Sequence, residues 1–496
     1  MSLKNTVVSS VGWTTAGRIF QQVFQFGLSV ILARLLVPAD FGLVGMVMVF
    51  SGVAGIFANF GFKSALVQRQ GLAERHLHAV FWFNLLIGAA LTVIFIASAP
   101  LLADFFHTAA LVQVTRAMAF SFLLGAFSIV PGALLQRQMR FATLTKIEVG
   151  VTLGCGAVGA TMAFLGCGVW SLVANMLLTT ACTSAALMWA AGYRPRWTFD
   201  RAAIRELFGY STHLVGANLI NYGARNADNL IIGKLLGAAS LGIYSRAYNL
   251  MLLPITQVIS VLSEVMFSTF CSIQDDRPRI KRIYLRAMAM IGAISFPVVL
   301  GLWAVADPFV LSFFGPQWVE VAPLLQILLL VSVTQCLAAP VGWIYTSQGK
   351  TNWLMWWNVF GGGAVILGIL VGAYLGTLKA FAWCYLASNA VIFYPCIAIP
   401  GKLIGMTFGE VMTAVLSPLL LSVTMAGGVY LLGWALPAKW PVGVQLLIQV
   451  TTGVIVYVVL LLVFRPQAYR DMWQLIAEKW TARKTRLSPQ PIAAGL

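Results

Sequence analysis

Charged side chains are scarce in this chain: only 9% of its 496 residues are charged, whereas 60% are hydrophobic. Soluble proteins carry about 25% charged residues, so a soluble globular protein of this length is excluded. Closely spaced metal ligands are also missing, because the seven cysteines form no CxxC pair and the four histidines show no metal-ligand spacing. No metal site is therefore expected, and the class that fits is a polytopic membrane protein.

Acidic residues are few as well, 15 against 32 basic residues, which gives a formal net charge of +17. A strongly basic chain can indicate nucleic-acid binding. Here the basic residues lie in short segments between apolar runs, as the positive-inside rule describes for membrane proteins, so no nucleic-acid partner is expected. No cleavable signal peptide is expected either, because a full-length apolar stretch follows residues 1–5 directly.

The apolar runs predict an all-α fold with about 14 transmembrane helices, since a chain inside lipid must satisfy its own backbone. The expected spans lie near 11–33, 40–62, 78–99, 113–135, 144–165, 169–192, 208–232, 241–266, 285–306, 322–346, 353–376, 379–400, 408–433 and 441–464. An even number of spans places both termini on one side. The segments on that side hold 24 of the 32 Lys and Arg residues, and the opposite loops hold four. Both termini are therefore predicted to be cytoplasmic.

An internal repeat relates two parts of the chain at an offset of 200 residues. Residues 30–50, VILARLLVPADFGLVGMVMVF, align with residues 230–250, LIIGKLLGAASLGIYSRAYNL. The identical pairs are Ile31/Ile231, Leu35/Leu235, Leu36/Leu236 and Gly42/Gly242, and Arg34 and Lys234 both carry a positive charge. Six spans separate the aligned helices, so the repeat is parallel and predicts two pseudo-symmetric six-helix lobes plus two extra C-terminal helices.

The repeat and the loop positions predict the domain organisation. The expected parts are an N-terminal lobe at 1–192, a cytoplasmic linker at 193–207, a C-terminal lobe at 208–400, a helix pair at 401–465 and a cytoplasmic amphipathic tail at 466–496.

A polar stripe marks the first helix of each expected lobe. In the second lobe its members follow one another at steps of three and four residues, which places them on one helix face. Three residues of the first lobe occupy equivalent positions. The candidate cavity-lining residues on the two stripes are Arg18, Gln21, Gln25, Asn218, Asn221, Arg225 and Asp228.

Two interpretations of these stripes remain open. An ionised side chain inside a span costs about 2.5–3.5 kcal/mol, so it must face a cavity or a partner. The stripes could line a water-filled cavity with cationic walls, or Arg225 and Asp228 could form a structural ion pair. Polar faces on both related helices favour the cavity.

Two further arginines, Arg116 and Arg246, lie a turn or two inside the expected outer interface and are added to the lining candidates. Snorkelling of their side chains toward the interface accounts for them equally well. Tryptophans near span ends are expected in an interfacial belt rather than in a binding site. They are Trp170, Trp303, Trp318, Trp434 and Trp440.

Four short motifs occur in order along the chain: NFGFKSALVQR at 59–69, LGIYSRAYNL at 241–250, FSTFCSIQDD at 267–276 and FFGPQW at 313–318. Together they resemble the polysaccharide-transporter branch of the multidrug/oligosaccharidyl-lipid/polysaccharide (MOP) exporter superfamily, close to the colanic acid exporter type. The resemblance implies a flippase of the bacterial inner membrane, not an enzyme. Its implied substrate is an undecaprenyl-diphosphate-linked oligosaccharide, moved to the periplasmic leaflet by alternating access for exopolysaccharide, capsule or lipopolysaccharide biosynthesis.

The same resemblance implies membrane lipids, a polysaccharide polymerase and its co-polymerase as partners. It implies no cofactor and leaves coupling to H⁺ or Na⁺ open.

Two other functions compete with the flippase. A multidrug or cation antiporter of the same superfamily needs an acidic cavity, whereas the charges within the spans are mostly arginines. A membrane polysaccharide polymerase or ligase is expected to carry catalytic residues on a sizeable outer loop. The longest expected outer loop, 307–321, is short and holds only Asp307 and Glu320 as acidic residues.

Overall fold

The protein is described by a computed structural model that covers the backbone of residues 3–59, 62–68, 73–197, 200–437, 439–465 and 470. Within these ranges the side chains of residues 3–16, 18, 19, 59, 64, 68, 201–218, 220, 221, 224, 258, 260, 261, 264, 265, 267 and 268 lie outside the description. The expected amphipathic tail also lies outside the described residues, apart from residue 470.

The described chain is helical and forms two compact units. The first unit contains residues 1–245 and the short segment Phe313–Trp318, and the second contains residues 246–312 and 319–496. This boundary falls within one long helix, and the two expected lobes with a linker at 193–207 stay a prediction.

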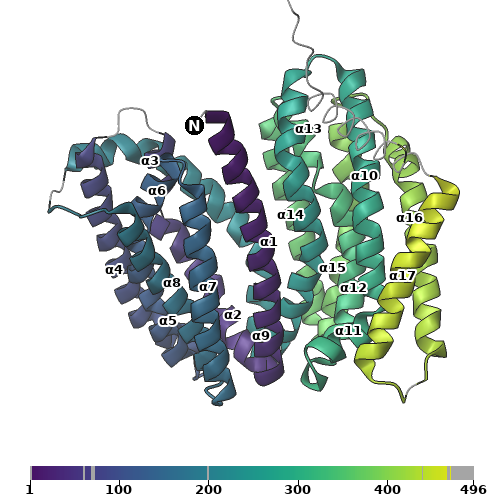
Figure 1. Ribbon diagram of the computed structural model, residues 1–496, viewed down its shortest axis with the longest axis horizontal. Coiled ribbons are helices and arrows are strands. Elements are labelled where there is room, and N and C mark those ends of the chain that lie inside the picture. The colour runs from purple at the N-terminus through teal and green to yellow at the C-terminus, as the bar shows by residue number, and fades with distance from the viewer. Residues whose placement is uncertain are drawn as a thin grey trace, which may run out of the picture. The chain divides into compact units, whose positions relative to one another are not determined.

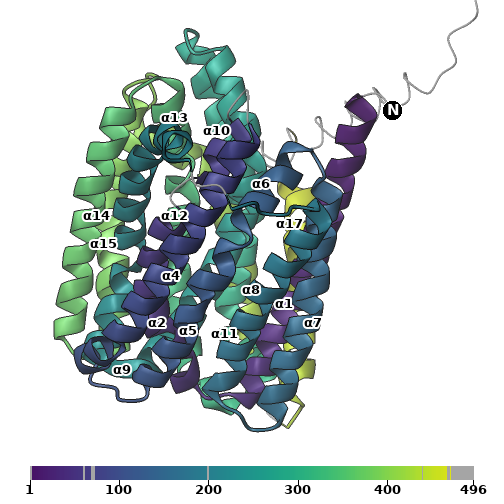
Figure 2. The same cartoon turned by 90° about the vertical axis from the view of Figure 1, so that its left-hand side faces the viewer.

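Eight helices and the first part of a ninth build the first unit (Figure 1). They are α1 (Leu3–Leu35), α2 (Pro38–Asn59), α3 (Phe62–Gln68), α4 (Glu74–Phe105), α5 (Leu111–Ala126), α6 (Ile129–Arg137), α7 (Phe141–Phe164), α8 (Val169–Ala191) and α9 (Arg201–Ser272). Helices α4, α5, α8 and α7 run alongside one another in Figure 2, and neighbours in this series pack together.

The second unit begins with the rest of α9, from residue 246. Its further helices are α10 (Arg277–Ala304), α11 (Ala306–Phe313, as far as residue 312), α12 (Val321–Ala338), α13 (Val341–Ser347), α14 (Thr351–Tyr374), α15 (Leu378–Gly401), α16 (Phe408–Ala435) and α17 (Val442–Phe464). The 3₁₀ turn η1 at Pro316–Trp318, between α11 and α12 in the sequence, belongs to the first unit.

Twelve helical stretches of the described residues are long and apolar enough to span a membrane. The expected all-α polytopic fold is confirmed, whereas the expected count of fourteen spans is not. The two remaining spans, expected at 11–33 and 208–232, fall on α1 and on the first part of α9. Many side chains of those helices lie outside the description, so these two spans stay predictions.

Helix α9 is too long to be one straight span. At 1.5 Å per residue its 72 residues would extend about 108 Å, several times the thickness of a bilayer core. It leaves helical geometry at Gly237, which has φ 83° and ψ 179°. A side chain would be strained in this conformation, so glycine is required there. Residue 237 is equivalent to Val37, which lies between the end of α1 and the start of α2, so both repeat units break at the same position.

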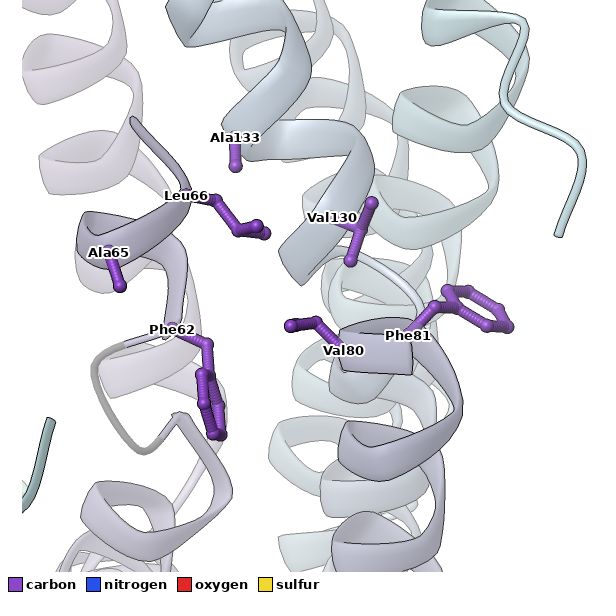
Figure 3. Packing of buried hydrophobic residues seen from close by; sticks show 7 residues of the cluster. All are labelled: Phe62, Ala65, Leu66, Val80, Phe81, Val130 and Ala133. Carbon is purple, nitrogen blue, oxygen red and sulfur yellow. The ribbon is translucent and has the colours of Figure 1, made fainter. Parts of the chain in front are cut away.

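A hydrophobic cluster fixes the short helices of the first unit (Figure 3). Phe62 and Leu66 of α3 are almost fully buried against Val80 of α4 and Val130 of α6. Full burial of side chains of this size contributes about 1.5–3 kcal/mol each. The cluster therefore holds α3 and α6 at the end of the unit where α4 begins.

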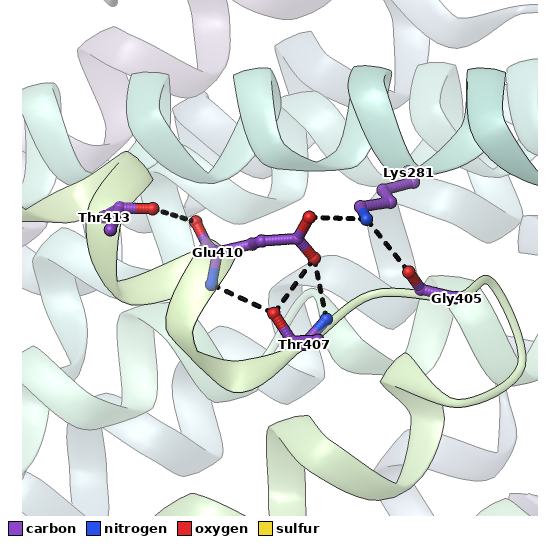
Figure 4. Close-up of polar contacts among 5 residues, drawn as sticks. All are labelled: Lys281, Gly405, Thr407, Glu410 and Thr413. Carbon is purple, nitrogen blue, oxygen red and sulfur yellow. Dashed lines mark hydrogen bonds and ion pairs between the residues drawn. The ribbon is translucent and has the colours of Figure 1, made fainter.

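In the second unit a polar network fixes the start of α16 (Figure 4). The Thr407 hydroxyl accepts a hydrogen bond from the backbone N–H of Glu410, whose carboxylate accepts one from the N–H of Thr407 at 2.8 Å. This reciprocal pair is a capping box. Lys281 of α10 lies 2.5 Å from the other carboxylate oxygen of Glu410 and donates to the carbonyl of Gly405 at 2.9 Å.

Candidate functional site

The expected polar stripes are partly described, and the described members lie on the first unit. The side chains of Arg18, Asn218 and Asn221 lie outside the description. Gln21 of α1 approaches the hydroxyl of Thr152 on α7 at 3.5 Å.

Gln25 and Arg225 are exposed. They occupy equivalent positions at the 200-residue offset, each twelve residues before the break at residue 37 or 237. At the helical rise of 1.5 Å per residue this is about 18 Å. The two repeat units thus present exposed polar side chains at the same depth.

Asp228 has a different environment from its neighbour on the stripe. Its carboxylate is buried, with 5% of the residue exposed, and accepts hydrogen bonds from the hydroxyl of Tyr244 at 2.7 Å and from the N–H of Asn229 at 2.8 Å. Tyr244 is itself fully buried and follows the bend at Gly237, whereas Asp228 precedes it. The bond therefore joins the two arms of α9.

The hydrogen bonds of Asp228 bear on the structural ion pair that its spacing from Arg225 allowed. An ion pair between Arg225 and Asp228 is not formed, since among the described side chains Asp228 is held by Tyr244 and Arg225 is exposed. The i, i+3 spacing allowed the pair, but the bend brings a residue sixteen positions away into hydrogen-bonding distance. The cavity-lining role of both residues stays a prediction.

The two added arginines differ in exposure. Arg116 of α5 is exposed, and Arg246 is half-buried at the start of the second unit. Their role in a cavity also stays a prediction.

Above the exposed stripe residues, the bend of α9 packs directly on the start of α2. A Cβ added to Gly42 would collide with the carbonyl of Ala238, and a Cβ added to Gly242 would collide with the carbonyl of Pro38. Residues 38 and 238 are equivalent at the 200-residue offset, as are 42 and 242. The contact is therefore reciprocal, with each repeat unit offering the same glycine to the same carbonyl of the other. We call these four residues the glycine crossing.

The repeat-related cations near the breaks also make related contacts. The guanidinium Nε of Arg34 donates to the carbonyl of Phe313 at 2.9 Å, and the ammonium of Lys234 donates to the carbonyl of Phe105. Phe105 ends α4, and Phe313 opens the Phe313–Trp318 segment of the first unit. Each cation thus donates to a backbone carbonyl of a neighbouring segment of the first unit.

The motif FFGPQW contributes a cap to α1. The indole N–H of Trp318 donates to the carbonyl of Ala33 at 2.7 Å, and the Gln317 amide donates to the carbonyls of Ala33 and Arg34 at 3.0 Å. These carbonyls belong to the last turn of a helix and have no partner within it. Trp318 is fully buried, so its expected place in an interfacial belt is wrong.

The two repeat units thus pack tightly at the breaks near residues 37 and 237. Each unit also presents an exposed polar side chain, Gln25 or Arg225, about 18 Å before its break. Glutamine offers both hydrogen-bond donors and acceptors, and arginine offers a planar fork that matches phosphate oxygens. The arrangement suits non-covalent binding of a polar, anionic molecule. The described residues contain no cluster of three His, Cys, Asp or Glu side chains placed to hold a metal ion.

Comparisons with known proteins agree with a transporter. The sequence profile of the family described as "Polysaccharide biosynthesis protein" matches residues 31–323. The teichuronic acid biosynthesis protein TuaB of Bacillus subtilis is 27% identical over 94% of this chain and 97% of its own length. The succinoglycan biosynthesis transport protein ExoT of Rhizobium meliloti is 27% identical over 98% of this chain and 97% of its own length.

Among solved structures, the lipid II flippase MurJ in an inward closed conformation superposes with a TM-score of 0.70. The match covers 92% of this chain and 99% of MurJ at 14% identity. At this identity the likeness shows the fold alone.

Proposed function

Because the chain belongs to the polysaccharide biosynthesis protein family of the MOP superfamily, we propose that it is a flippase for a lipid-linked oligosaccharide. The proposed substrate is a repeat unit linked to undecaprenyl diphosphate, and the proposed step carries it from the cytoplasmic to the periplasmic leaflet. The chain is a multi-pass membrane protein and a transport protein, not an enzyme.

The observation that carries the proposal is the equivalent placement of Gln25 and Arg225. Both side chains are exposed about 18 Å from the breaks at residues 37 and 237. An arginine at this depth is costly unless it meets water or an anion. A diphosphate supplies the anion, and Arg–phosphate hydrogen bonds are among the strong ones because both groups are charged. Sugars supply hydroxyl groups for the amides, while the polyprenyl chain stays in lipid.

The relatives support polysaccharide transport over drug export. TuaB is named for teichuronic acid biosynthesis and ExoT for succinoglycan transport. A cation antiporter would need an exposed carboxylate on the stripe, and Asp228 is buried. The polymerase or ligase alternative conflicts with membership of a transporter family.

Several finer points belong to the proposal. The distribution of basic residues predicts that both termini lie in the cytoplasm. We call the end of each unit on that side of the membrane the expected cytoplasmic end. Alternating access between two lobes, coupling to H⁺ or Na⁺, and association with a polymerase and its co-polymerase follow the same resemblance.

The test combines a deletion with a substitution on the stripe. Deletion should stop the export of one polysaccharide and leave its lipid-linked repeat unit in the cytoplasmic leaflet. Arg225→Ala should do the same while the protein inserts and accumulates normally, and Arg225→Lys should restore transport only in part because lysine lacks the planar fork. The readouts are secreted polymer and extracted lipid-linked intermediates. Normal export in the deletion strain, with no second copy of the gene, would refute the proposal.

A further inference from the structure

A hollow of about 380 Å³ lies between α1 and α7 in the first unit. Gly17 and Phe20 of α1 line one side, and Thr145, Lys146 and Gly150 of α7 line the other. Lys146 is the sixth residue of α7, at the expected cytoplasmic end of the unit. We call this cavity the α1–α7 hollow.

Two glycines explain why the hollow exists. A Cβ added to Gly17 would collide with the side chain of Thr145, so its absence allows the helices to approach closely there. Gly150 lies on the facing helix, and an added Cβ on that residue would meet nothing within 4 Å. The Gly150 position therefore faces open space, next to a close helix contact at Gly17.

The chemistry of the lining is graded along α7. Lys146 is the one cation among the residues that line the hollow, and it is exposed. The remaining wall is apolar apart from the Thr145 hydroxyl, and it includes the half-exposed ring of Phe20. Gly150 lies four residues beyond Lys146, which places the apolar space about 6 Å deeper. A ligand that fits this sequence has an anionic group joined directly to a hydrocarbon chain.

We infer that the α1–α7 hollow holds the start of the polyprenyl chain, with Lys146 on the adjoining diphosphate, as the substrate enters from the cytoplasmic leaflet. The inference rests on the proposed function and adds to it a subsite for the lipid part of the substrate. The opposite wall is α1, the helix that also carries Gln21 and Gln25 of the stripe.

The division of tasks between the residues follows from their chemistry. Lys146 binds phosphate as a point charge, which arginine can also supply. Gly150 contributes only space. Filling that space should exclude the hydrocarbon whether or not a phosphate is attached, whereas removing the charge should weaken only phosphate-bearing ligands.

The test measures binding of undecaprenyl diphosphate and undecaprenol to the purified full-length protein by native mass spectrometry. Gly150→Leu should weaken both ligands about tenfold, and Lys146→Gln should weaken undecaprenyl diphosphate by a similar factor while leaving undecaprenol unchanged. Lys146→Arg should retain binding. The matched control is Gly154→Leu, because Gly154 lies one turn further along α7, has open space around its Cβ and does not line the hollow.

Three outcomes separate the possible failures. If the unmodified protein does not bind undecaprenyl diphosphate, the proposed function fails. If it binds and Gly150→Leu has no larger effect than Gly154→Leu, the hollow is not the subsite while the proposed function stands. If phosphatidylglycerol displaces undecaprenyl diphosphate and its own binding is equally sensitive to Gly150→Leu, the hollow is an ordinary phospholipid site and the inference is overturned.

Discussion

At one end of the first unit, α2 and α9 touch through backbones; at the other end, α4 holds a connecting segment through side chains. The glycine crossing has no room for even a Cβ, and Trp318 beside it is fully buried. At the opposite end, His78 and Trp82 of α4 hold residues 193–197 by hydrogen bonds and ring contacts.

The histidine at this second end has a defined role. Its Nδ1 accepts the backbone N–H of Arg196 at 3.3 Å, so this nitrogen carries no proton, and the Tyr193 hydroxyl donates to the same atom at 3.0 Å. The indole N–H of Trp82 donates to the carbonyl of Arg196 at 2.9 Å. These contacts anchor the segment that leads into α9.

The difference separates two ways of fixing a helix end. The glycine crossing depends on the absence of side chains at the contact. The stability of the protein should therefore fall when atoms are added there, and this loss should hardly change with pH or salt. The segment at 193–197 is set by protonation and hydrogen bonding, so it should respond to pH while tolerating small changes in volume. The glycine crossing is therefore tested with added or removed side-chain volume, and the 193–197 segment is tested with changes in pH.

The largest effect is expected for Trp318→Ala. It removes a fully buried ring and the donor to the Ala33 carbonyl, and large-to-small core substitutions of this kind cost about 3–5 kcal/mol. The readout is the melting temperature of the purified protein in detergent. Trp434→Ala is the control, because Trp434 is 80% exposed and its loss should cost less than about 0.5 kcal/mol. Equal losses would mean that Trp318 is a belt residue after all.

A smaller loss is expected for Gly42→Ala, about 1–3 kcal/mol from overpacking against a backbone carbonyl. Gly242→Ala should match it, since the crossing is reciprocal. Gly55→Ala on the same helix α2 should instead gain up to about 1 kcal/mol, because its Cβ meets nothing within 4 Å and alanine favours helix. Melting temperatures at pH 6 and pH 8 should show the same differences. A loss for Gly42→Ala but not for Gly242→Ala would break the reciprocity.

The glycine crossing shows how far sequence comparison reaches. The 200-residue offset pairs Gly42 with Gly242 and Pro38 with Ala238. These four residues form the glycine crossing in the structure. The all-α membrane fold and the family also followed from composition and motifs, whereas the expected count of fourteen spans is not confirmed. These features depend on local patterns, which the sequence contains.

Other features depended on contacts between distant residues. The i, i+3 spacing left Arg225 open as a partner of Asp228, but the bend at Gly237 brings in Tyr244. Trp318 resembles a belt tryptophan until the α1 carbonyls that it caps are known. The α1–α7 hollow lies beside residues of two helices that are distant in the sequence, and no residue pattern marks an empty space.

At the other end of the first unit, a pH-dependent effect is expected for Tyr193→Phe. Burial raises the pKa of the Tyr193 phenol, and the nearby charge of Glu74 raises it further. The phenol therefore stays protonated in the folded state when the unfolded state releases its proton. Its stabilising contribution is fully present below about pH 10, the ordinary tyrosine pKa, and is lost as the pH rises through the folded-state pKa.

At neutral pH the substitution should cost about 1 kcal/mol, the net value of one hydrogen bond. The gap in melting temperature between the unmodified protein and Tyr193→Phe should then narrow between pH 9 and pH 11. Tyr374→Phe is the control, because Tyr374 is 90% exposed, and its gap should not change. A constant gap for Tyr193→Phe would show that its hydroxyl does not serve as the donor to His78.

The smallest effect is expected at the corresponding place in the second unit, where α10 rather than α4 holds the segment that leads into the next helix. There Lys281 contacts Glu410 and the Gly405 carbonyl, and the side chains of both charged residues are partly exposed. An exposed ion pair gains little and is screened by salt. Lys281→Gln should therefore lower the melting temperature less than Tyr193→Phe does at neutral pH, and the difference should shrink between 0.05 and 0.5 M NaCl, whereas that of Tyr193→Phe should not. Since the capping box of Thr407 and Glu410 remains intact in Lys281→Gln, α16 keeps its start. A salt-independent loss would mean that the carbonyl of Gly405, and not the charge of Glu410, is the contact of Lys281 that matters.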